Sequence, residues 1–285
     1  MSLLKRFINS ILTLIGAVLQ PFKDVAEVRE LFLRQLHEQS KLAHPNPINH
    51  FGQKCFSQSD EDGITLEILR RLKCLEHGTF AEFGVGDGTE NNTLILKALG
   101  WKGFWVGGES LAFESKQQRS EFNYLQTWIT LENIVALMHQ GKKDIEAMTV
   151  DVVSLDLDGN DIYFVQKLLA AENKPKLFIV EYNAKFIPPV KWQISYEAKH
   201  SWTEDDYYGA SLASFAELFE SHSYILVCCN SATGSNAFFV RSEFANSFID
   251  VPRDIGALFV PPRFSVYRHY GHKPSLRTIE RLFEV

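Results

Sequence analysis

The stretch Phe80-Ala81-Glu82-Phe83-Gly84-Val85-Gly86-Asp87-Gly88 decides the fold of this chain. Its apolar first half predicts a buried strand over residues 78–83, which runs into a turn with glycine at every second position. Glycine lets the backbone approach a ligand where a Cβ atom would collide, and a helix predicted over residues 89–99 would offer free N–H groups. A dinucleotide fingerprint requires its third glycine five residues after the first, but Thr89 occupies that position. The turn therefore predicts a pocket for another ligand, with a tight turn that binds nothing as the alternative.

Alternating strand-like and helix-like segments on both sides of this turn predict a Rossmann-like α/β fold, with helices on both faces of a mostly parallel sheet. Strands are expected at residues 78–83, 103–106, 127–130, 152–157, 177–180, 224–229 and 237–240. Helices are expected at residues 64–72, 89–99, 113–123, 133 onward, 162–171 and 211–220. Ser57 or Asp60 would cap the first of these helices. The chain is divided into N-terminal helices (1–50), the α/β domain (51–245) and a C-terminal extension that packs on it (246–285).

The N-terminal segment is amphipathic. Residues 1–20 carry apolar side chains at helical spacing, and Pro21 ends this helix; a second helix over residues 24–43 stops at His44-Pro45-Asn46-Pro47. The first helix is too short to cross a bilayer and lacks a signal-peptide cleavage site. It either packs on this or a neighbouring subunit of a homo-oligomer, or lies on a membrane surface with Lys5 and Arg6 towards the headgroups.

Composition narrows the class of protein. The chain has 285 residues, of which 45% are hydrophobic, and a net charge of −6, which argues against a nucleic-acid-binding protein. The four cysteines form no C-x-x-C pair, and the adjacent Cys228 and Cys229 suit a reducing compartment. We therefore expect a cytoplasmic protein, with contact to the inner face of a membrane if the N-terminal helix binds lipid. The histidines do not follow zinc-site spacing.

Two residues after the second and third predicted strands suit an adenosine-containing cofactor. Glu109 lies 27 residues after Glu82 and could accept hydrogen bonds from both ribose hydroxyls. Asn133 could meet an adenine edge, or it could cap the next helix.

Carboxylates gather where the fourth and fifth predicted strands end. Asp156, Asp158 and Asp161 fall within six residues, and Glu181 and Asn183 follow the next strand. Because neighbouring parallel strands end at the same edge of a sheet, these side chains are expected to converge. Their oxygen atoms suit Mg²⁺, for which Asp158, Glu181 and Asn183 are the expected ligands. The alternative is an Asx-type turn in which Asp158 or Asn160 only caps the next helix.

Residues 182–208 form an unusually long connector without periodicity, as lids and binding surfaces often do. Its aromatic side chains could stack on a sugar ring, or they could pack the connector onto the sheet. Within it, His200 joins Asp158 and Asp161 as a candidate base for an acceptor hydroxyl.

Several segments together resemble the FkbM-like group of class I S-adenosylmethionine-dependent methyltransferases. Residues 156–161 (DLDGND) are similar to the group's I-D-x-E-G-x-E segment, with Asp in place of Glu at positions 158 and 161. Residues 57–63 (SQSDEDG) are similar to its S-Q-x-x-E-D-G segment, and residues 208–212 and 234–240 to its later blocks. The resemblance spans about residues 55–241. It implies a seven-stranded sheet with the last strand antiparallel, S-adenosylmethionine as methyl donor, and transfer to an oxygen of a sugar, glycan or other small molecule.

The resemblance also implies roles for the residues of the glycine turn. Gly84, Gly86 and Gly88 would shape the pocket for the methionine part, Glu82 would hold its amine, and Asp156 would lie near the sulfonium. A nicotinamide-dependent oxidoreductase is disfavoured by Thr89 and by the lack of a Tyr-x-x-x-Lys pair. A non-catalytic scaffold that binds a partner is the other alternative.

Overall fold

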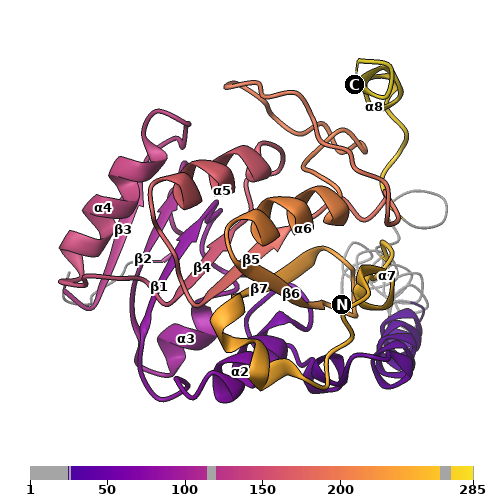
Figure 1. Ribbon diagram of the computed structural model, residues 1–285, viewed down its shortest axis with the longest axis horizontal. Coiled ribbons are helices and arrows are strands. Elements are labelled where there is room, and N and C mark those ends of the chain that lie inside the picture. The colour runs from indigo at the N-terminus through magenta and orange to yellow at the C-terminus, as the bar shows by residue number, and fades with distance from the viewer. Residues whose placement is uncertain (1–24, 26, 114–119, 264–270, 285) are drawn as a thin grey trace, which may run out of the picture. The chain divides into compact units, whose positions relative to one another are not determined.

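A computed structural model gives the structure of residues 25, 27–113, 120–263 and 271–284 (Figure 1). One compact unit begins at His44, and the residues before it form another. In the first unit residues 27–43 are helical, and the helix ends before the predicted stop at His44. The predicted helix over residues 1–20 lies outside the described residues. None of the helices that the structure describes combines the length and the hydropathy that a bilayer-spanning segment needs.

The second unit contains a seven-stranded sheet with the order β3-β2-β1-β4-β5-β7-β6. Strand β7 pairs antiparallel with both of its neighbours, while β1 to β5 pair in parallel. This confirms the predicted α/β fold with an antiparallel last strand. The strands are β1 (Thr79–Phe83), β2 (Lys102–Gly107), β3 (Phe122–Gln126), β4 (Val152–Leu155), β5 (Leu177–Glu181), β6 (Tyr224–Cys229) and β7 (Asn236–Arg241).

Helices cover both faces of this sheet, as Figure 1 shows. Successive strand residues face opposite sides, so Phe83 packs in one core cluster with residues of α4 to α6 and Phe80 packs in another with residues of α2 and α3. The helices are η1 (Pro47–Phe51), α2 (Glu61–Arg71), α3 (Leu94–Ala98), α4 (Ile134–Asp144), α5 (Asp161–Ala170), α6 (Leu212–Ser221), η2 (Ser242–Phe248), α7 (Ile255–Leu258) and α8 (Leu276–Arg281).

The position predicted for the third strand is wrong. Residues 127–130 form a loop, and β3 lies just before them, where Phe122 packs edge-on against Trp105 at 5.0 Å between ring centroids. The β-branched and aromatic residues of the loop have strand-like composition but leave the sheet after the Thr127 amide donates to the Gly107 carbonyl at 2.8 Å. The helix predicted over residues 113–123 therefore cannot reach Phe122; residues 114–119 lie outside the described part of the chain.

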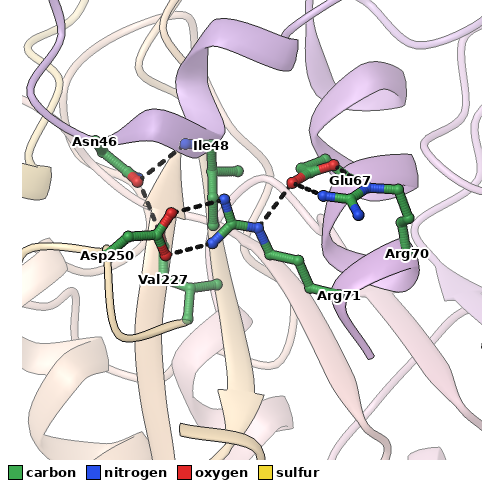
Figure 2. A network of polar contacts seen from close by, with 7 residues as sticks. All are labelled: Asn46, Ile48, Glu67, Arg70, Arg71, Val227 and Asp250. Carbon is green, nitrogen blue, oxygen red and sulfur yellow. Dashed lines mark hydrogen bonds and ion pairs between the residues drawn. The ribbon is translucent and has the colours of Figure 1, made fainter. Parts of the chain in front are cut away.

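Polar contacts attach α2 to the C-terminal extension and the start of η1 to strand β6 (Figure 2). The buried Glu67 accepts hydrogen bonds from Arg70 and from Arg71, and Arg71 forms a bidentate pair with Asp250 at 2.6 and 3.0 Å. Nearby, the Asn46 amide donates to the Val227 carbonyl of β6 at 2.8 Å and accepts from the amide of Ile48. The segment that precedes β1 is thus fixed by residues that follow β5.

Candidate functional site

The glycine turn after β1 contains two glycines with different constraints. Gly84 has φ +91°, and a Cβ atom there would lie 1.5 Å from the carbonyl oxygen of Asp156, which follows β4. A Cβ atom on Gly86 would meet nothing within 4 Å. Packing of the protein itself thus requires glycine at 84, whereas at 86 only a bound ligand would require it.

Glu82 has a structural role that the sequence did not predict. Its carboxylate accepts from the amides of Asn92 and Thr93 at 3.0 and 3.1 Å and from the Thr93 hydroxyl at 2.5 Å. These bonds fix the irregular segment after the turn, and the helix predicted from Thr89 begins only at Leu94, which corrects that prediction. Burial raises the pKa of Glu82, while the Thr93 and Asn92 donors oppose this. The carboxyl also lines a cavity, so its contact with an amine remains a prediction.

Two cavities, each of about 310 Å³, border the turn and share Gly84, Gly86 and Asp156 in their walls. We call the first the polar cavity; its wall consists of Gln58, Glu82, Gly84, Gly86, Asp87, Gly88, Thr89, Glu90, Asn91, Asn92, Asp156 and Asn236. We call the second the mixed cavity; its wall consists of Gly84, Val85, Gly86, Gly107, Gly108, Glu109, Trp128, Ile129, Asp156, Leu157, Asp158, Asn160, Phe164, Ala198 and His200.

The mixed cavity contains Glu109 at its predicted place, two residues beyond β2. Its backbone carbonyl accepts a hydrogen bond from the Tyr124 hydroxyl, and its side chain is exposed. Asn133 does not line the cavity. Its side chain accepts from the Thr130 amide and donates to the Trp128 carbonyl, both at 2.8 Å, and gives no cap to α4. Asn133 thus fixes the loop that presents Trp128 and Ile129, two wall residues that the sequence reading assigned to a strand.

The carboxylates at the ends of β4 and β5 converge as predicted, but the residues that form the cluster differ from those expected. Single oxygen atoms of Asp156, Asp158 and Glu181 lie within 4.8 Å of one another. Burial, and then the charges of Asp158 and Asp161, raise the pKa of Asp156 well above its usual value. Burial and then the Asp156 charge do the same to the pKa of Glu181, whose buried Oε2 has no hydrogen-bond partner among the described residues. Such a cluster needs a proton or a cation to offset the repulsion.

Asn183 does not join this acidic cluster. It is 1% exposed, and its amide donates to the carbonyls of Asp206 and Tyr208 at 3.0 and 2.9 Å while accepting from the Lys185 amide. Asn183 fixes the connector backbone, and Asp156 occupies the place expected for it. Tyr208, which the sequence reading missed, lies near the acids: burial and then the Glu181 charge raise its pKa well above the usual value, so its hydroxyl stays protonated.

Asp161 lines neither cavity and holds the acidic turn in shape. Its carboxylate is fully buried and accepts from the amides of Leu157 and Gly159 at 2.7 and 2.9 Å. Burial raises its pKa to about 6, against the effect of these two donors. The predicted role as base does not fit this bonding. Asp158, which the turn leaves exposed with φ +52°, carries its carboxylate into the wall of the mixed cavity.

His200 is brought beside Asp158 by the connector. A Cβ atom on Gly159 would lie 2.2 Å from the His200 ring, so glycine allows the two segments to touch. Asn160 donates to the Glu197 carbonyl at 2.8 Å and accepts from its amide at 3.3 Å, which fixes the connector there. Burial and then the Arg277 charge lower the pKa of His200, and its buried Nε2 has no partner among the described residues. His200 thus contributes to the wall of the mixed cavity, while its Nε2 atom is itself buried.

The connector is also bound to the C-terminal helix. Asp206 is 2% exposed and accepts from the Ser275 amide at 2.8 Å and from the Thr278 hydroxyl at 2.6 Å, and it contacts the Lys185 ammonium. Of the predicted stacking residues, Trp192 is 4% exposed and stacks on Phe186 at 4.4 Å between ring centroids. For Trp192 the packing alternative therefore holds.

The acidic segment before β1 reaches the polar cavity through Gln58. Of the two predicted caps for α2, Asp60 does occupy the N-cap position, but its side chain makes no capping bond and accepts instead from the amides of Ser231 and Ala232 at 3.0 and 3.1 Å. Ser57 does not cap the helix, and its hydroxyl donates to Asp62. Tertiary bonds have taken the place of a local cap. They fix Gln58 against the turn before β7, which the sequence alone could not indicate.

No family model matches this chain, and no curated protein matches it. Among solved structures, the chain is similar to an O-methyltransferase family 2 protein from Planctomyces limnophilus DSM 3776 in complex with apigenin, at 10% identity and a TM-score of 0.32. The match covers 57% of this chain and 51% of that chain, so it spans about half the length of that protein. The fold class is established by the order and directions of the strands and not by this similarity. The FkbM-like affiliation remains a prediction.

Proposed function

We propose that the protein is an S-adenosylmethionine-dependent O-methyltransferase that acts on a hydroxyl of a sugar or glycan-like acceptor. One observation carries the proposal: two cavities meet at Gly84, Gly86 and Asp156, with Glu109 in one wall and an acidic cluster beside their junction. A split site of this kind suits a ligand with an adenosine part and an amino-acid part.

The two cavities bind different parts of the ligand. Glu109 binds the ribose hydroxyls, while Trp128 and Ile129 offer apolar contact to the base. The polar cavity receives the amino-acid part over the open face of Gly86. S-adenosylmethionine, when bound, supplies an electrophilic methyl group on its sulfonium.

The acceptor hydroxyl is activated by residues at the rim of the mixed cavity. Asp158 accepts the hydroxyl proton, and His200, which lines the same cavity, is the alternative base. Methyl transfer requires the oxygen and the methyl group in line, and we assign this positioning to Asp156, which lines both cavities.

Titration calorimetry tests the proposal. Wild-type protein should bind S-adenosylmethionine or S-adenosylhomocysteine at micromolar concentration, and Glu109→Ala should weaken this binding by about 1–3 kcal/mol because two hydrogen bonds to ribose are lost. Glu172→Ala, which removes an exposed carboxylate paired with Lys174, is the control and should bind as wild type. Binding of a nicotinamide cofactor instead would support the oxidoreductase alternative. If the protein binds none of these ligands, the non-catalytic scaffold is supported.

We further propose that the acidic cluster holds a divalent cation such as Mg²⁺ through Asp156, Asp158 and Glu181. The donor set fits, since it consists of hard oxygen atoms and includes a buried carboxylate oxygen without a partner. A cation here would hold two neighbouring sugar hydroxyls and ease deprotonation of one of them.

Thermal unfolding in Mg²⁺ or Mn²⁺ tests the cation site without an acceptor. At a hundredfold excess over the Kd, binding should stabilise the wild type by about 2.7 kcal/mol, and Glu181→Gln should lose most of this gain. Glu217→Gln, an exposed carboxylate paired with Lys191, is the control. An unchanged wild-type transition, together with full activity in a chelator, would remove the metal.

A further inference from the structure

The polar cavity has a one-sided charge. Its wall contains the carboxylates of Glu82, Asp87, Glu90 and Asp156, and no lysine, arginine or histidine is among its described lining residues. The amino-acid part of the proposed ligand carries an ammonium and a carboxylate. The wall suits the ammonium, but it would repel the carboxylate unless a donor or cation lies close by.

Three of the backbone donors after the turn are already engaged. The Thr89 amide donates to the Asp87 side chain at 3.0 Å, and the amides of Asn92 and Thr93 donate to Glu82. Three N–H groups that could have bound a carboxylate therefore have partners within the protein.

Lys54 lies at the rim of this cavity. Its ammonium donates to the Gln58 carbonyl at 3.0 Å and lies 3.6 Å from the Glu90 carboxylate, and both of these residues belong to the wall. The Lys54 and Glu90 side chains are 53% and 57% exposed, and their separation is longer than that of a charge-assisted hydrogen bond. A loose, solvated pair of this kind leaves the ammonium available to another anion at little cost.

We propose that Lys54 binds the carboxylate of the amino-acid part of S-adenosylmethionine, while Glu82, Asp87 and Asp156 of the polar cavity bind its ammonium. The inference rests on the proposed function and deepens it, because it assigns one end of the ligand to one side chain. Lys54 is then a binding residue that precedes the whole sheet in the sequence. It selects ligands that carry a complete amino-acid end.

Two ligands test this assignment, S-adenosylhomocysteine and 5′-methylthioadenosine, which keeps the adenosine and thioether but lacks the amino-acid end. By calorimetry, Lys54→Met should weaken S-adenosylhomocysteine binding about ten- to a hundredfold and leave methylthioadenosine binding unchanged. Lys191→Met is the control: this lysine is 58% exposed, pairs with Glu217 at 2.6 Å, and should affect neither ligand. Equal affinities of wild type and Lys54→Met for S-adenosylhomocysteine, or equal losses for both ligands, would overturn the inference while leaving the proposed function intact.

A second variant separates ligand contact from the pair within the protein. Glu90→Gln removes the partner of Lys54, so S-adenosylhomocysteine should bind as tightly as to the wild type or more tightly. A loss equal to that of Lys54→Met would show that the ion pair is what matters, and would overturn the inference. If the wild type binds neither nucleoside, the proposed function fails and the inference falls with it.

Discussion

Replacing Gly86 with alanine should reduce S-adenosylhomocysteine binding by about a hundredfold or more and leave the thermal unfolding transition unchanged. Glycine is not required here by the protein, because a Cβ atom would meet nothing within 4 Å and the residue has no positive φ. The added methyl group would instead project into the space that the two cavities share, and a 1 Å misfit at a binding site can cost about a hundredfold. Calorimetry and differential scanning fluorimetry on the same preparation measure the two quantities.

Gly84→Ala is the matched variant, and it should lower the stability of the fold, which Gly86→Ala should leave unchanged. Its Cβ atom would lie 1.5 Å from the Asp156 carbonyl oxygen, so the β1 and β4 exits must separate, and the free energy of unfolding should fall by about 3 kcal/mol or more. Gly100→Ala controls for backbone strain alone, since Gly100 has φ +83° with nothing within 4 Å, and should cost about 1 kcal/mol. If Gly86→Ala binds the ligand like the wild type, the ligand does not lie over this turn, and the proposed site is wrong.

Asp158→Asn should lower the rate of methyl transfer by about 10²- to 10⁴-fold with little change in S-adenosylhomocysteine affinity, because it removes the base and not the cofactor contacts. Asparagine keeps the shape of the side chain and tolerates the left-handed backbone at φ +52°, so the turn should survive. Transfer of tritiated methyl groups to acceptors from a panel of sugars and glycans provides the activity assay. Full activity in the variant would move the base to another residue, and His200→Gln would then be the variant to examine.

The pH dependence of the same reaction adds an independent readout. The side chain of Asp158 reaches solvent, but the acids and loops packed around its carboxylate still desolvate it and raise its pKa above the usual value; a protonated His200 would act in the opposite direction. The ionised carboxylate is the active form, so the wild-type rate should increase as pH rises through this raised pKa and then level off. The rate of the Asp158→Asn variant should not show this increase with pH. Both proteins are measured at one fixed cation concentration, so that the pH is the only variable.

Local sequence patterns were sufficient to predict the positions of most strands and of three helices. The helices α4, α5 and α6 and the strand β6 lie within a residue of their predicted starts, since each has a continuous apolar face bounded by polar turns. The error at β3 arises because Thr127 to Thr130 have strand-like composition, whereas the neighbouring strand selects Phe122 to Gln126 through packing on Trp105. Such a choice depends on tertiary contacts.

Those site residues whose positions follow from the order of the strands could be predicted from the sequence. Those whose positions depend on individual side-chain contacts could not. Parallel strands bring Asp156 and Glu181 together whatever their rotamers, and the glycine turn fixes the first cavity. The partners of Asn183 and Glu82 come from loops that no periodicity describes, so their structural bonds were missed. Lys54 and Trp128 carry no motif, and only the folded chain places them beside the cavities.

Asp206 has a consequence for how such a protein can diversify. It couples the connector to α8 across 69 positions of sequence, and Arg277 and Arg281 add contacts to Glu197 and to the Gln193 carbonyl. Exchanging one of these segments alone would remove the donors of Ser275 and Thr278 from the buried Asp206 carboxylate and leave Lys185 as its partner. The connector and α8 are therefore expected to change together in sequence.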